Sequence, residues 1–320
     1  MLNIPVQLLD VIDKKENILL AGIGGDFDVL GAMPLYYTLK ARNKKVHLSN
    51  FGSTDFKSVA ESSSPIVINP DLIAATATIK NPIAHFPEGY LSEWFKIMFQ
   101  EDIPIWMFKK VGVIPLRLNY EHLIKELGID MIILIDSGMD SLNTGVEEGC
   151  GTLLSDSITI AALSQINGID KIVVTTGFAT EIEQEICNLS VLRNIAAAIK
   201  NDAYFGCCSM TKNMVSYKMY EKACVHVFNE NEKTSPVHRR IIPSIEGEFG
   251  NFHATNEDVG LEICVSPLMS IMWFFNFQTL TLTNKLISYL LETITFDDAV
   301  QAGVPIIKGT NTIPWIPLPY

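Results

Sequence analysis

Long hydrophobic runs are missing from this sequence, and so is the pattern of a secretory signal. The longest apolar stretch, residues 267–277, is too short to span a bilayer. The first residues, MLNIPVQLLDVIDKKE, carry acids where a signal peptide needs a basic end and a long apolar core. We therefore expect a cytoplasmic protein that has no membrane partner.

Basic residues are also scarce. The chain of 320 residues contains 24 Lys and Arg against 36 Asp and Glu, a net charge of -12 at pH 7. Such a surface repels nucleic acid, so we expect no nucleic-acid partner. A small anion can still bind locally, through backbone N–H groups or a single cation.

Several signatures of catalysis and metal binding are absent. The sequence has no G-x-S-x-G nucleophile elbow, no P-loop and no H-x-x-x-H pair. Its six cysteines lack zinc-site spacing, and the adjacent Cys207 and Cys208 cannot supply a C-x-x-C motif. Most of the cysteines are therefore expected to be buried, reduced side chains.

Short apolar runs, each ending in a turn, are what the sequence does contain. Continuous runs of this kind predict strands buried on both faces of a parallel sheet. They lie at residues 18–21, 45–49, 131–135, 171–175 and 225–228. Helical patterns lie between them, at residues 29–40, 120–127, 156–165 and 181–200. This alternation predicts an α/β fold, an open and mostly parallel sheet with helices on both faces.

No linker or repeat divides the chain, so residues 1–320 are expected to form a single domain. Residues 57–119 contain several prolines and are predicted to be a loop-like insertion that covers the site. The apolar stretch 266–277 is interpreted as a core helix or a subunit contact, which leaves a homo-oligomer open. The proline-rich end, residues 303–320, is expected to be extended.

Four turns should meet in space, because strand-to-helix loops of a parallel sheet share one edge and ligands bind there. Their sequences are GIGGDFD, NFGSTDF, DSGMDSLNTG and TTGFATE, and all four contain glycine and an acid. The site is therefore expected where these turns converge.

The first turn allows more than one interpretation. Gly24 and Gly25 can bring the backbone close to an anion, and Asp28 can contact the ligand or simply cap the following helix. A dinucleotide fingerprint would need a glycine at Phe27. The letters GGDF also occur in diguanylate cyclases, but there they lie in a hairpin, whereas a helix is expected here.

The third turn concentrates carboxylates at the end of a strand. Asp136 and Asp140 should repel one another unless a cation, a shared proton or hydrogen bonds intervene. They are candidates for an Mg²⁺ site or for a general base, with Ser137 and Gly138 beside them as ligand contacts. Alternatively, both acids bond loop amides and Asp156 caps the next helix.

Two further segments complete the candidate site. Glu181, in the fourth turn, is a catalytic candidate that would orient the substrate, and Gly177 lies next to it as a ligand contact. His238 and Arg239 form a local positive charge that meets a phosphate or neutralises nearby acids.

These motifs resemble domain-of-unknown-function family 1152. The matching stretches are GIGGDFDVLGA, IDSGMDSLNTGVEEGCGTLLSDSITIAAL, TGFATE followed by SVLRNIA, and GEFG with SPLMSIMWFF. Members usually carry a further glycine where Asp26 stands here. The resemblance implies a Rossmann-like cytoplasmic enzyme or binding protein, without implying a reaction.

Together these features predict an enzyme that hydrolyses a small phosphorylated or nucleotide-like metabolite, or transfers a group from it. The alternative is a sensor that binds such a metabolite without turnover. Nicotinamide-dependent redox chemistry is disfavoured by the glycine spacing.

Overall fold

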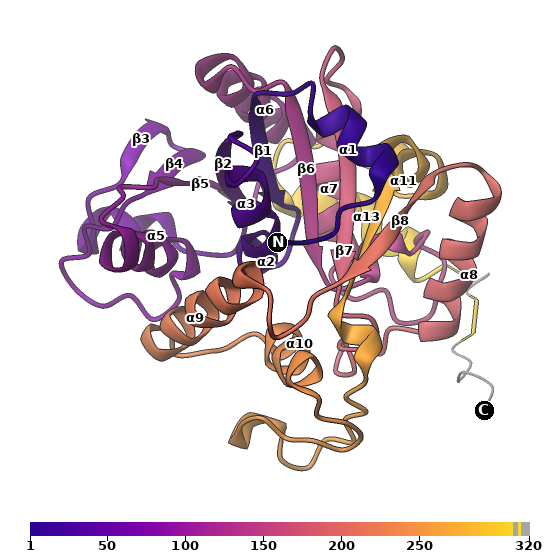
Figure 1. Ribbon diagram of the computed structural model, residues 1–320. Helices are drawn as coiled ribbons and strands as arrows, with labels where there is room; N and C mark the ends of the chain where they lie inside the picture. The colour runs from indigo at the N-terminus through magenta and orange to yellow at the C-terminus, as the bar shows by residue number, and fades with distance from the viewer. Residues whose placement is uncertain (310–312, 315–320) are drawn as a thin grey trace.

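The computed structural model describes residues 1–309, 313 and 314. Within them, nine strands form one sheet in the order β3-β4-β5-β2-β1-β6-β7-β9-β8 (Figure 1). The strands are β1 (Asn17–Gly22), β2 (Lys45–Phe51), β3 (Ile66–Asn69), β4 (Leu72–Ala75), β5 (Ile105–Phe108), β6 (Met131–Ser137), β7 (Asp170–Thr176), β8 (Tyr204–Ser209) and β9 (Ile271–Asn276).

The five central strands, β5-β2-β1-β6-β7, are parallel. The continuous apolar runs predicted four of them, β1, β2, β6 and β7, whereas β5 lies in the segment that was expected to be loop-like. Both sides of the sheet are antiparallel: β4 pairs with β5 and β3 with β4, while β9 pairs with β7 and β8 with β9. The expectation of a mostly parallel sheet is therefore correct for the centre and wrong for the two sides.

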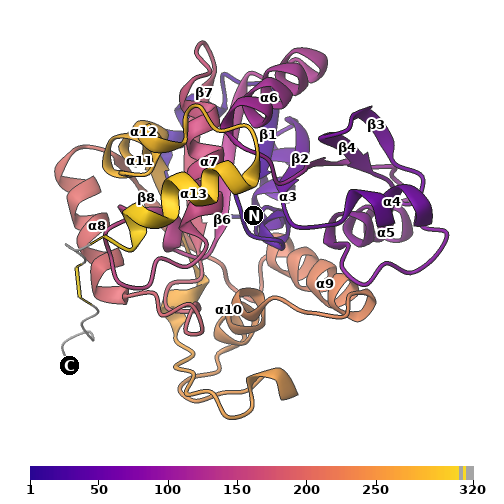
Figure 2. The same cartoon turned by 180° about the vertical axis from the view of Figure 1, so that it is seen from behind.

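Helices cover both faces, as predicted. They are α1 (Val6–Ile12), α2 (Asp28–Gly31), α3 (Met33–Lys40), α4 (Phe56–Ser62), α5 (Pro87–Phe99), α6 (Val113–Leu127), α7 (Leu153–Ser164), α8 (Asn188–Lys200), α9 (Val215–Glu230), α10 (Pro236–Glu246), α11 (Phe277–Thr283), α12 (Ile287–Leu290) and α13 (Phe296–Ile307). Successive residues of a strand point to opposite faces of the sheet, so they belong to two separate hydrophobic cores. Ile133 belongs to the core that includes residues of α1, α3 and α9. Leu134 belongs to the core on the other face, which includes residues of α6 and α7 (Figures 1 and 2).

Four local predictions are wrong. Residues 225–228 lie inside α9 and are not a strand, and the helix expected from residue 181 begins only at Asn188. Residues 57–119 are not loop-like, because they contain β3, β4, α5 and β5. In the apolar stretch 266–277, interpreted as a core helix, Ile271–Asn276 instead form strand β9 after a short 3-10 turn at Pro267–Ser270.

At the C-terminus, helix α13 includes residues 303–307 of the segment expected to be extended, and most of the rest lies outside the described residues. Helices of the described region all fall short of the length and hydropathy that a bilayer-spanning helix requires.

The strand order reverses between β1 and β6. The chain leaves β1 toward β2 on one side, whereas β6 and β7 lie on the other. The loops that follow β1 and β6 therefore separate at the carboxyl edge and leave room between them, which is where open α/β sheets bind ligands.

Candidate active site

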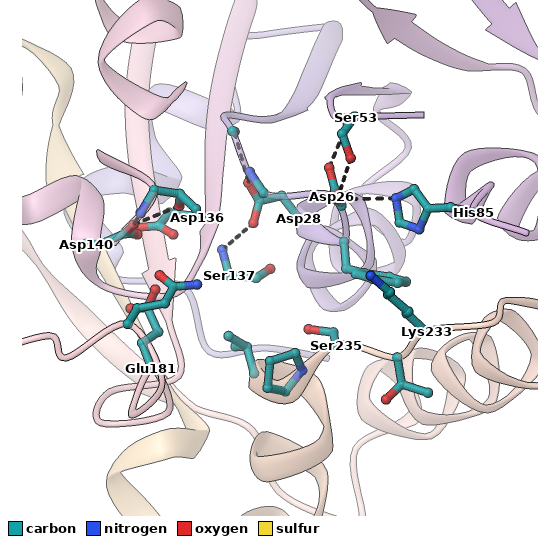
Figure 3. A pocket seen from close by; sticks show the side chains of 18 of the residues that line it. Asp26, Asp28, Ser53, His85, Asp136, Ser137, Asp140, Glu181, Lys233 and Ser235 are labelled. Carbon is teal, nitrogen blue, oxygen red and sulfur yellow. Dashed lines mark hydrogen bonds and ion pairs between the residues drawn. The ribbon is translucent and has the colours of Figure 1, made fainter. Parts of the chain in front are cut away.

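A cleft of about 540 Å³ opens at this edge. The segments that follow β1, β2, β6 and β7 all contribute to its lining, through Asp28, Ser53, Asp140 and Glu181. Figure 3 shows Asp136, Asp140 and Glu181 gathered on one side, opposite His85 and Lys233. The four turns that the sequence singled out do converge, although they come from distant parts of the chain.

Asp28 joins the glycine turn to the end of β6. Its Oδ2 accepts hydrogen bonds from the N–H groups of Gly24 (3.1 Å) and Gly25 (2.7 Å), and its Oδ1 accepts one from Ser137 N–H (2.9 Å). The glycine amides, which we expected to bind an anionic ligand, are therefore already bonded to a carboxylate of the protein. Asp28 thus organises the loops, while both glycines still line the cleft.

Asp136, Asp140 and Asp156 form a buried aspartate triad. Each can place a carboxylate oxygen within 4.8 Å of the others. Ser141 donates to Asp136 Oδ2 through its backbone N–H (3.3 Å) and its hydroxyl, and Thr152 donates in the same two ways to Asp140 Oδ2. Asp156, for which a helix cap was one interpretation, lies inside the first turn of α7 and joins this cluster.

Asp156 packs against the glycine turn so closely that no larger residue fits there. A Cβ at Gly24 would lie 2.1 Å from Asp156 Oδ1 and 2.8 Å from the Asp156 backbone nitrogen. The other oxygen, Oδ2, is buried and accepts no hydrogen bond from the described residues. The glycine at position 24 is therefore explained by the carboxylate behind it.

Glu181 reaches the same side of the cleft from the loop after β7. Its Oε2 accepts a hydrogen bond from Met139 N–H (2.7 Å), and its other oxygen has no donor among the described residues. A Cβ at Gly138 would lie 2.8 Å from the Glu181 carboxylate. Gly138 therefore contributes to the site by admitting this side chain, although it is outside the cleft lining.

Burial of these acids raises their pKa values. It raises the pKa of Asp28 to about 6, against three opposing N–H donors. Burial, and next the charges of neighbouring carboxylates, raise the pKa values of Asp136, Asp156 and Glu181 well above their ordinary range. In the described part of the chain, no ion pair joins any of these acids to a basic side chain.

A second polar cluster, which sequence reasoning missed, lines the opposite wall. Asp26 accepts hydrogen bonds from Ser53 N–H (2.7 Å) and Ser53 Oγ (2.6 Å), and His85 Nε2 lies 3.3 Å from Asp26 Oδ2. The hydrogen bond to Asp26 raises the pKa of His85. Burial disfavours the Asp26 charge, but the contacts of His85 and Ser53 outweigh it and hold the pKa of Asp26 below its usual range.

Two lysines add positive charge to this side of the cleft. Lys110 follows β5 and donates to Gly24 O (3.3 Å) and Ser155 Oγ (3.2 Å). Lys233 lies in the segment that leads into α10 and is exposed. The position of Lys110 directly after a buried strand could have indicated from the sequence that it belongs to the site. Nothing in the sequence indicated this for His85 and Lys233, because only tertiary packing brings them to the cleft.

Besides Gly138, three predicted site residues lie outside the cleft lining. His238 is fully buried and bonds Tyr220 OH (2.7 Å) and Phe27 O (3.0 Å) through its two ring nitrogens. Arg239 pairs with Glu257 (3.2 Å) and Asp258 (3.4 Å), so its charge neutralises acids. Gly177, at a φ of 83°, leaves space for the side chains of α10.

His238 should make the fold sensitive to acid. Burial lowers its pKa to about 4, below the ordinary value of 6.5, so the folded state favours the neutral ring. The contribution of neutral His238 to the free energy of unfolding is therefore complete above pH 6.5. As the pH falls from 6.5 toward 4, protonation of this histidine in the unfolded state lowers the free energy of unfolding by up to about 1.4 kcal/mol per pH unit. Urea unfolding between pH 7 and 4 should therefore show a smaller loss in His238→Gln than in the wild type. Equal losses would contradict this role.

Comparison with known proteins supports the sequence resemblance. Residues 106–308, well over half of the chain, match the family described as "Protein of unknown function (DUF1152)". The matched region contains the aspartate triad and Glu181, whereas the glycine turn precedes it. No curated protein and no solved structure matches the chain. The acidic loop and the motifs after it thus indicated the family correctly, and the chain belongs to domain-of-unknown-function family 1152.

Proposed function

We propose that this protein is an enzyme that hydrolyses a small phosphorylated or nucleotide-like metabolite or transfers a group from it. The observation that carries the proposal is the polarity of the cleft. Buried carboxylates line one side of it, and His85 and Lys233 lie on the other. The proposal includes a Rossmann-like relationship, which the central strand order and the position of the cleft support.

The side of the cleft that carries His85 and Lys233 is suited to bind the anionic end of such a substrate. His85 is biased toward its protonated form by Asp26, and Lys233 has no ion pair within the described residues. The N-terminus of α10, at Ser235 and Pro236, lines the same side and adds partial positive charge. Together they would orient a phosphate with its scissile bond toward the acids.

Glu181 is the residue best placed to act as general base. Met139 N–H fixes one of its oxygens, and the other is unbonded within the described residues. Because the raised pKa of this carboxylate makes it a stronger base than an ordinary glutamate, it can accept a proton from water or from a substrate hydroxyl. The resulting water or substrate oxygen would then attack the phosphorus while the scissile P–O bond breaks, and the leaving group would depart with the bonding electrons and take up the proton from Glu181 or from solvent.

A paired ligand screen tests the proposal. Phosphorylated metabolites and nucleotides should raise the melting temperature more than their dephosphorylated counterparts, and phosphorus NMR should detect turnover of the binders. Lys233→Gln should weaken binding about 10–100-fold, as expected for loss of a charge-assisted contact. Lys200→Gln, at the end of α8, should bind normally.

The outcomes separate the candidate functions. If phosphorylated compounds bind but none of them is turned over, the protein is the sensor of the alternative. Equal stabilisation by compounds with and without phosphate, unaffected by Lys233→Gln, would rule out both.

A further inference from the structure

Three buried aspartates meet at the floor of the cleft without a compensating charge. Asp136, Asp140 and Asp156 are 3%, 1% and 1% exposed, and their carboxylate oxygens come within 4.8 Å of one another. Three ionised groups at this spacing, shielded from water, would destabilise the fold unless protons or a cation neutralised them.

The donors from Ser141 and Thr152 approach only Oδ2 of Asp136 and of Asp140. The Asp140 carboxylate also contacts the carboxyl group of Asp156. In Asp156 it is Oδ2 that has no partner, although this oxygen is buried. Native proteins rarely leave a buried carboxylate oxygen unbonded, so this atom indicates a missing partner.

We propose that Asp136, Asp140 and Asp156 bind one hard divalent cation, Mg²⁺ or Mn²⁺. Carboxylate oxygens are the ligands that these ions prefer. All three ligand oxygens lie within 4.8 Å of one another, close enough for one divalent ion to contact all of them at ordinary metal–oxygen distances.

Two other aspartates of the cleft are unsuitable as ligands. Both oxygens of Asp28 are occupied by backbone N–H groups, and Asp26 is occupied by Ser53 and His85. Asp136 and Asp140 line the cleft, so the ion has access from solvent and to a bound substrate. Its role in turnover rests on the proposed function, whereas its binding does not.

Metal binding can be measured without any substrate. Chelator-treated protein is titrated with Mn²⁺, free Mn²⁺ is followed by electron paramagnetic resonance, and Mg²⁺ is added as competitor. We expect one Mn²⁺ per chain, displaced by Mg²⁺. Residues that merely support metal ligands cost about 10–100-fold in affinity when replaced, so Asp156→Asn should weaken binding by at least that factor.

Asp26→Asn is the matched control, since it removes a carboxylate from the same cleft but outside the triad. It should bind Mn²⁺ as the wild type does. Thermal unfolding gives a second reading: Mn²⁺ should raise the melting temperature of the wild type and not that of Asp156→Asn. In chelator, Asp156→Asn should be at least as stable as the wild type, because it removes an uncompensated carboxylate.

Two results would overturn the proposal. One is a wild-type protein that takes up neither Mn²⁺ nor Mg²⁺ at millimolar concentration, as expected if Asp140 and Asp156 share a proton instead. The other is an Asp156→Asn variant with unchanged affinity. If Asp156→Asn does not fold, Asp140→Asn is measured in its place. The number of Mn²⁺ ions bound per wild-type chain still tests whether the protein binds a metal ion. Metal uptake without turnover would contradict the proposed function and leave the metal site intact.

Discussion

Replacing Glu181 with glutamine should lower turnover about 100- to 10,000-fold, the usual contribution of a general base. Glutamine keeps an oxygen that can accept the hydrogen bond from Met139 N–H, so the loop should stay in place. It cannot accept a proton from the attacking group. Turnover is measured with whichever phosphorylated compound the screen identifies, and affinity for that compound should change little.

The same variant separates the roles of the two acidic groups. Glu181 is outside the aspartate triad, so Glu181→Gln should bind Mn²⁺ normally, whereas Asp156→Asn should not. A Glu181→Gln enzyme that retained most of its turnover would show that another group takes the proton. A parallel loss of ligand affinity would instead assign Glu181 to substrate binding.

Replacing Arg240 with methionine should cost about 3–5 kcal/mol of unfolding free energy, the penalty for breaking a buried ion pair. Arg240 is 1% exposed, and its guanidinium donates to both carboxylate oxygens of Glu183, at 2.8 and 2.5 Å. It also donates to Thr180 O, directly before Glu181, and to Asp258 (3.4 Å). The arginine thus fixes the loop that presents the proposed base.

Chemical denaturation measures this loss. Arg240→Lys keeps the charge but not the paired geometry and should be intermediate. Arg117→Met provides the matched control, because Arg117 pairs with Glu121 on the partly exposed side of α6. That variant should lose no more than about 1 kcal/mol. Equal losses in Arg117→Met and Arg240→Met would contradict the structural role given to Arg240.

Sequence patterns located the central strands well because burial on both faces requires continuous apolar runs. MIILI became β6 and KIVVT became β7. The same reasoning failed for residues 225–228, where a short apolar run fits a helix as well as a strand. It also failed for β9, which pairs antiparallel with β7 and β8, a choice that depends on the neighbours and not on its own residues.

The candidate site was predictable in part for a similar reason. Asp28, Asp136 and Glu181 follow strand ends, and parallel strands bring their carboxyl ends to one edge. For Asp156 the sequence left a helix cap and a place among the clustered acids both open, because only the packed structure shows which side chains its carboxylate contacts. The placement of His238 was also not predictable, since a histidine beside two arginines can face a ligand or be buried behind a loop.

The sequence by itself determined the α/β class, four of the five central strands, the family and the four acidic turns, since each depends on local composition and strand periodicity. Only the tertiary structure decided which acids face one another and which are already satisfied by backbone N–H groups. It also decided that His85 and Lys233 stand opposite them. The physical reason is that hydrogen-bond satisfaction and charge compensation depend on distances between side chains remote in sequence, and those distances exist only after the sheet and its covering helices have packed.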